Sequence, residues 1–294
     1  MWIKLFLHQY MGMKAMKPSD SPGLYDRIFR PYSYTLGNGK KVEEKRSRLP
    51  LVIILLLAAT IISGEITGFS LSTLLLRINY FFVMLGDMFP PDWAYMSQVW
   101  TPLWDTIKMS LLGSVIGALL CIPFSVLSSG NLVKNRAVTG FFKFFFSVVR
   151  TLPTLVVALI ATYVFGLGTL AGTVAIAVFT FAYCGKILYE QIETVDMGSH
   201  EALEALGMGK LSAIRYSVWP QVLPSFLSTV LFCFEGNVRY ASILGYVGAG
   251  GLGLILNEKI GWREYPRVGM ILIALFVAVV VIESLSSWLR SKLT

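Results

Sequence analysis

Long apolar runs separated by short polar segments dominate the pattern along the chain. Six of these runs reach or approach the roughly 20 residues with which a helix crosses a bilayer. Only 14% of the residues are charged, whereas a soluble domain has roughly a quarter. The pattern therefore predicts an all-α, polytopic membrane protein with about six transmembrane helices. The predicted spans are 49–64, 103–128, 146–166, 168–190, 222–244 and 266–288.

Basic residues flank these spans unevenly, which predicts their orientation. Lys and Arg are concentrated before the first span, in the connections 129–145 and 191–221, and at the carboxyl end. Because basic residues favour the cytoplasmic side of a membrane, we expect both termini in the cytoplasm. Residues 1–48 then form a cytoplasmic basic segment, and residues 49–294 form the transmembrane domain, with its core at about 100–290. The connection 245–265 weakens the pattern, because it carries Lys259 and Arg263 on the predicted outer side.

Composition argues against several other classes of function. The net charge is +8, and the basic residues behind it lie mostly beside a membrane span. They form no motif in which basic and aromatic residues are interleaved, so we expect no nucleic-acid partner. Cys121, Cys184 and Cys233 lie in apolar runs and the only histidines are His8 and His200, so we expect neither a disulfide framework nor a metal site. The chain has no glycine-rich phosphate loop ending in Gly-Lys-Ser/Thr. We therefore expect no cofactor on this chain, and energy for any active process must come from a partner.

The connection at about 195–220, between the fourth and fifth spans, has a distinctive pattern. It opens with a helix-compatible run, and Gly207 follows where a helix can end in a left-handed turn. A second apolar stretch ends at Pro220, which lacks the N–H that a continuing helix needs. A short helix, a glycine turn and a second helix form a compact protrusion, and such a protrusion can enter a groove on another protein.

The spacing of this segment resembles the EAA loop of the permease subunits of binding-protein-dependent ABC importers. Leu203, Ser217 and Trp219 depart from the usual pattern. The resemblance implies a type I importer transmembrane domain whose loop is the coupling helix that docks on the ATPase subunits. The residues that carry the match are Glu201, Ala202, Gly207 and Pro220.

A second block sharpens the resemblance. The sequence Glu-Gly-Asn-Val-Arg at 235–239 precedes the glycine-rich run 244–253, and together they are most similar to the phosphonate-transport permeases. The resemblance covers about residues 80–290. It implies a second copy of the permease, two ATP-binding subunits that hold ATP and Mg, an extracytoplasmic solute-binding protein, and residence in the cytoplasmic membrane of a prokaryote.

The same block has a physical interpretation of its own. Glu235 and Arg239 share a helix face and can pair, whereas Asn237 points elsewhere. Charges in the outer part of the fifth span are costly if they face lipid, so they line the path or its gate, or form a buried structural ion pair. The glycines predict an outer gate or a contact for the binding protein, or else plain close packing of helices. They are Gly248, Gly250, Gly251 and Gly253.

Two further cations lie within the apolar runs. Arg150 and Lys186 fall near the predicted cytoplasmic ends of the third and fourth spans. Snorkelling of these long side chains to lipid headgroups explains such positions cheaply. The alternative is a pair of groups that help an anion to leave toward the cytoplasm.

These features predict a transport permease rather than an enzyme, one that carries a small oxyanion, phosphonate or phosphite. Permeases for phosphate, methionine or a quaternary amine stay open as alternatives, although a buried arginine suits an anion better. An ion-driven secondary transporter would show matched internal repeats, and no clear repeat is visible. An intramembrane enzyme needs a nucleophile–base or metal constellation, and none is apparent in the sequence.

Overall fold

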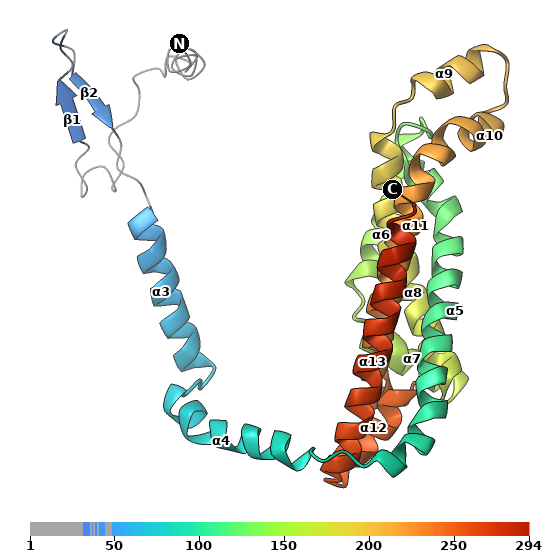
Figure 1. The fold of residues 1–294 in the computed structure, drawn as a ribbon. Helices are drawn as coiled ribbons and strands as arrows, with labels where there is room; N and C mark the ends of the chain where they lie inside the picture. Colours follow the sequence, from blue (N-terminus) through green and yellow to red (C-terminus); the bar gives the residue numbers. More distant parts are fainter. Residues whose placement is uncertain (1–31, 36, 38, 40, 45–48, 294) are drawn as a thin grey trace. The chain divides into compact units, whose positions relative to one another are not determined.

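The computed structural model describes residues 32–35, 37, 39, 41–44 and 49–293, which are helical almost throughout (Figure 1). The predicted all-α membrane fold is confirmed. One addition is a short antiparallel hairpin, β1 (Tyr32–Thr35) and β2 (Lys41–Glu44), in which Tyr32 pairs with Glu44. A Gly-Asn-Gly sequence lies between the strands and is typical of a hairpin connection. Most of the predicted basic segment 1–48 lies outside the described residues.

The chain divides into two compact units, residues 1–78 and 79–294. The first unit contains the hairpin, α3 (Leu49–Ile66) and the start of α4 (Leu71–Asp87). No residue of α3 is buried, as expected for an apolar helix that faces lipid. The predicted domain boundary at residue 48 stays a prediction.

Five helices are long and apolar enough to cross a membrane, and a bent pair of helices brings the number to as many as six. Five predicted spans are thereby confirmed, with longer helices than the apolar runs alone indicated. The five spans are Leu49–Ile66, Trp93–Ser128, Thr169–Thr194, Lys210–Val247 and Tyr265–Arg290.

The third predicted span, 146–166, is wrong as a single continuous helix. It consists of α6 (Arg136–Thr151) and α7 (Thr154–Phe165), which meet at 85°. Pro153 causes the break: proline has no N–H to donate, and its ring disfavours helical backbone at the preceding residue. Leu152 is accordingly extended, with ψ 120°.

The second unit is a bundle of α5 (Met96–Ser128), α8 (Thr169–Thr194), α11 (Trp219–Leu244) and α13 (Tyr265–Arg290), together with the α6–α7 pair (Figure 1). Glycines bring α5 close to α8, because a Cβ on Gly117 would lie 2.5 Å from the carbonyl oxygen of Ala177. All three cysteines are buried as free thiols, and the sulfurs of Cys184 and Cys233 lie 3.4 Å apart between α8 and α11.

Short elements cover the two ends of this bundle (Figure 1). At one end, α9 (Gly198–Ala205) and α10 (Lys210–Ala213) project beyond the long helices, and the π-helical turn η2 (Ile214–Val218) leads from α10 into α11. The opposite end carries α12 (Leu252–Gly261) and the two single turns η1 (Trp93–Tyr95) and η3 (Gly245–Val247).

Candidate functional site

The loop 195–220 folds as the predicted helix, glycine turn and second helix. Gly207 adopts φ +86°, a left-handed conformation that other residues adopt only with strain. Glu201 and Ala202 lie exposed on α9. The most prominent apolar groups are Leu206 and Leu211, which are 83% and 82% exposed. The projecting loop therefore offers a small apolar surface beside an acidic one.

The prediction that Pro220 ends the second helix is wrong. Pro220 lies in the first turn of α11, directly after the π-helical turn. Proline cannot donate a backbone hydrogen bond, and the wider π turn before it tolerates the missing bond. The loop is consequently joined to α11 by continuous helical backbone.

His200 and Ser217 join α9 to η2, and sequence reasoning missed both. His200 is buried, and its Nδ1 lies 3.3 Å from the hydroxyl of Ser217. Its Nε2 lies 3.6 Å from a carboxylate oxygen of Glu204. Ser217 occupies one of the positions at which the chain departs from the aliphatic pattern of the EAA loop. That departure at Ser217 was the signal in the sequence that could have pointed to this contact.

Glu235 and Arg239 form the expected pair on one face of α11. The guanidinium of Arg239 donates to Glu235 Oε1, and Arg290 approaches Glu235 Oε2 at 3.5 Å. The Glu235 side chain is only 6% exposed, whereas that of Arg239 is 53% exposed. The buried carboxylate is thus compensated by two arginines.

Asn237 points away from that pair, as predicted. Its amide donates to the hydroxyls of Ser114 (2.8 Å) and Thr180 (2.9 Å), near the middles of α5 and α8. In this conformation Asn237 is 1% exposed and ties three helices together.

The glycine-rich run packs tightly against neighbouring backbone and side-chain atoms. A Cβ on Gly253 would lie 2.0 Å from the carbonyl oxygen of Ser242, and one on Gly251 would lie 2.6 Å from Thr106 Oγ1. The N–H of Leu252 donates to that same Thr106 hydroxyl at 2.7 Å. Close packing is therefore present, whereas the gate stays a prediction. Gly248, Gly250 and Gly251 all have positive φ.

Ion pairs join the elements at this end of the bundle. Arg267 contacts Glu264 (2.7 Å) and Asp92 (3.4 Å), and Lys259 contacts Glu264 (3.3 Å). Loss of hydration would raise the pKa of Glu264, but the hydrogen bonds from Arg267 and Lys259 outweigh it and lower that pKa. The network fastens α12 and η1 to the start of α13.

Arg150 is not at the end of a span. It lies in the last turn of α6, at the break before α7, and shares a cavity with Ala182 and Tyr183 at the middle of α8. These α8 residues are more than about 15 Å from either end of their helix. Snorkelling to lipid headgroups and an anion path both stay predictions for Arg150. The third span was predicted to begin at residue 146, whereas α6 begins at Arg136, so Arg150 lies further from the start of the helical pair than expected.

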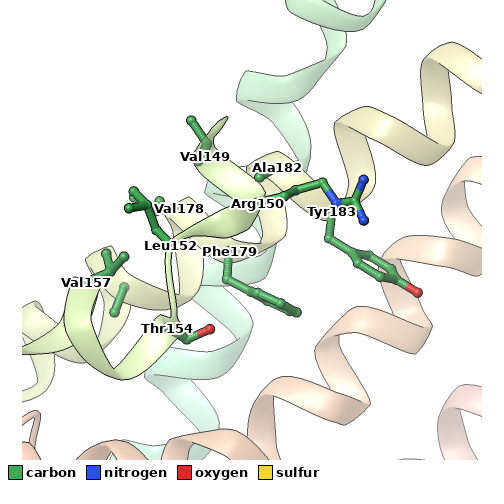
Figure 2. Close-up of a pocket in the computed structure, with 10 residues that line it drawn as sticks. Val149, Arg150, Leu152, Thr154, Val157, Val178, Phe179, Ala182 and Tyr183 are labelled. Carbon is green, nitrogen blue, oxygen red and sulfur yellow. The ribbon is translucent and has the colours of Figure 1, made fainter. Parts of the chain in front are cut away.

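The cavity beside Arg150 has a volume of about 170 Å³ and is formed by α6, α7 and α8 (Figure 2). A neighbouring groove of about 500 Å³ shares the side chains of Phe179 and Tyr183 and includes Arg239 on α11. The rings of Phe179 and Tyr183 stack at 5.8 Å. The two cavities therefore adjoin at these two aromatic side chains, and each cavity is lined by one arginine.

Lys186 belongs to neither cavity. Its ammonium lies 3.2 Å from the carboxylate of Glu190, one turn further along α8. The two candidate anion-path cations therefore do not line the same one of these cavities. Within the described ranges, no group of three His, Cys, Asp or Glu residues is arranged to hold a metal ion.

Known proteins resemble this chain in sequence and in fold. The phosphate-import permease protein PhnE of Mycolicibacterium smegmatis is 32% identical over 79% of this chain. The phosphite transport system permease protein PtxC of Stutzerimonas stutzeri is 29% identical over 74% of this chain and 80% of its own length. The chain spans about half the length of two relatives: 46% of PhnE and 56% of a second protein from S. stutzeri.

The solved structure of the MetNI methionine ABC transporter in inward-facing conformations shares the fold. Its TM-score is 0.62 at 20% identity, and the match covers 69% of this chain and 99% of that chain. The family described as "Binding-protein-dependent transport system inner membrane component" matches residues 121–294. The chain also has several apolar helices long enough to cross a membrane. It belongs to this family of membrane transport components.

Proposed function

We propose that this chain is the permease subunit of an ATP-driven importer that carries a small phosphorus oxyanion, phosphonate or phosphite. The observation that carries the coupling part is the loop 195–220, which projects from the bundle and exposes Leu206 and Leu211. An exposed apolar surface rimmed by polar groups is typical of a protein–protein interface.

The partners follow from that role. Two ATP-binding subunits in the cytoplasm bind ATP and Mg and contact the α9 loop, where Glu201, Ala202, Gly207 and Pro220 shape the docking surface. A second copy of the permease completes the path, and an extracytoplasmic binding protein delivers the substrate to the opposite end of the bundle. Both termini are then cytoplasmic. The chain itself catalyses no reaction in this proposal.

The glycine-rich end of the bundle is the natural place for an outer gate. Gly250 and Gly253 pack against backbone, and Gly248 and Gly251 pack against the side chains of Leu167 and Thr106, so a small shift there changes several contacts together. Glu235 and Arg239 lie deeper, where their pairing orders α11 beside the path. Asn237 orders the bundle from inside. These roles are consistent with the packing, and each is separable by mutation.

The substrate class is supported by two kinds of observation. The printed names of the relatives from M. smegmatis and S. stutzeri refer to phosphate and phosphite. Independently, Arg150 and Arg239 line neighbouring cavities at the middle of the bundle, and guanidinium groups suit tetrahedral oxyanions better than zwitterionic or cationic solutes. Phosphate is the alternative substrate that the first of these names favours.

Uptake by liposomes that contain the permease, its ATP-binding subunit and its binding protein tests the substrate. We expect uptake of methylphosphonate or phosphite that excess methionine does not compete away. Uptake of methionine with no oxyanion uptake would refute the substrate class. If phosphate is taken up in preference to phosphonate and phosphite, the result would instead favour phosphate as the substrate.

A further inference from the structure

We infer that the break between α6 and α7 holds a binding site for a small tetrahedral oxyanion within the permease itself, with Arg150 as its charged group. This inference rests on the proposed function, because it takes the cargo to be an anion. It assigns the site to the cavity of about 170 Å³ drawn in Figure 2.

The first support is the depth of the charge. Arg150 lies beside the middle of α8, at residues that are more than about 15 Å from either end of that helix. A charge at that depth is costly unless it faces a water-filled or protein-lined space, and such residues mark substrate pathways. The Leu152-Pro153 break supplies that space, because it turns α7 away from the line of α6 by 85°.

The second support is a set of polar groups without partners. The guanidinium of Arg150 and the hydroxyls of Thr154 and Tyr183 line the cavity, and none of them bonds to any other residue in the described part of the chain. Figure 2 shows the side chains of Arg150, Phe179 and Tyr183 extending to the same side. One forked cation and two hydroxyl donors match the needs of an anion with three oxygens.

Arg239 shows why the site is assigned to Arg150. Arg239 lines the larger groove, which also includes Phe179 and Tyr183, but its charge is shared with the buried carboxylate of Glu235. Lys186 is similarly paired with Glu190. Arg150 has no carboxylate within 4 Å among the described residues, so its field is the least compensated of the three.

The volume also suits a small ion. About 170 Å³ is roughly ten times what one water molecule requires, which accommodates phosphite or methylphosphonate with a few waters. The stacked rings of Phe179 and Tyr183 form an apolar wall that leaves room for a methyl group beside the charged oxygens. The site therefore favours small phosphorus oxyanions over bulky organic anions.

The test compares Arg150→Gln with Arg136→Gln in the complete importer in liposomes. Arg136 is the first residue of the same helix and is exposed outside the cavity. We expect Arg150→Gln to lower phosphite uptake by about tenfold or more, the loss of one charged hydrogen bond. Arg136→Gln keeps wild-type uptake, and both variants retain ATP hydrolysis stimulated by the binding protein.

A chemical rescue separates a charge requirement from a folding defect. Arg150→Cys is treated with a thiosulfonate reagent that adds either an aminoethyl or a sulfonatoethyl group. We expect the cationic group to restore a substantial part of phosphite uptake and the anionic group to restore none. Neither reagent changes uptake by the wild type, whose three cysteines are buried.

The outcomes distinguish the site from the proposed function. If the wild type carries phosphite but Arg150→Gln carries it equally well, or if both reagents act alike on Arg150→Cys, the site is refuted and the importer stands. If the wild type carries no oxyanion at all, the proposed substrate and this site are both refuted.

Discussion

Asn237 and Arg150 are both polar residues at mid-height in the bundle, and their surroundings give them different roles. The amide of Asn237 is enclosed and bonded to hydroxyls on two other helices, so it contributes order. The guanidinium of Arg150 is exposed and lines a cavity, so it is free to meet a ligand. The sequence shows both residues within apolar runs, but it does not show which helices they contact.

Replacing Asn237 tests the structural role. Asn237→Leu removes two interhelical hydrogen bonds and leaves the hydroxyls of Ser114 and Thr180 without that partner. We expect a loss of about 0.5–2 kcal/mol in stability, measured as a lower Tm of the purified protein in detergent. Thr229→Ala is the control, because that exposed hydroxyl bonds only within α11. An unchanged Tm together with abolished uptake would contradict the structural role and favour a path-lining one.

At the scale of elements, apolar run length predicted most of the fold, because a bilayer selects long apolar helices whatever their partners. Apolar run length could not predict the break at Leu152-Pro153, because the apolar run continues through the proline and only the helix geometry changes. The height of Arg150 depends on that geometry and on the start of α6 at Arg136. The glycine-rich run was recognised by composition, but its contact with Thr106 comes from a distant part of the chain.

Glycine replacements test the packing of α12. Gly253→Ala places a methyl group 2.0 Å from the backbone oxygen of Ser242, and a backbone contact cannot relax as a flexible side chain does. We expect destabilisation of about 1–3 kcal/mol and a lower yield of folded protein on size-exclusion chromatography. Gly261→Ala in the same helix has nothing within 4 Å and should be nearly neutral. Equal behaviour of the two variants would show that α12 does not pack in this way.

At the scale of the whole molecule, coupling requires that events at the α9 end reach the mid-height cavities. The backbone provides one physical connection: the loop continues through η2 into α11, and α11 carries Glu235 and Arg239. ATP binding on a partner can shift the permease between two states only if the partner contacts those states with different affinity. The docking surface on α9 and α10 is where such a difference would enter.

Mutation of the exposed leucines tests that docking surface. Leu206→Glu and Leu211→Glu change side chains that are more than four-fifths exposed, so the fold should be little affected. We expect loss of the ATP-binding subunit on co-purification and at least about a tenfold fall in ATP-dependent uptake, as for central residues of an interface. Leu206→Met keeps an apolar side chain and should retain both. Undiminished co-purification of both glutamate variants would place the coupling surface elsewhere.

The most direct test of the central claim is the energy source of oxyanion uptake by the complete importer in liposomes. We expect phosphite or methylphosphonate to enter only when ATP, the ATP-binding subunit and the binding protein are all present. We also expect that dissipating ion gradients leaves the initial rate unchanged. Uptake by the permease alone, driven by a proton or sodium gradient without ATP, would contradict this expectation and identify a secondary transporter.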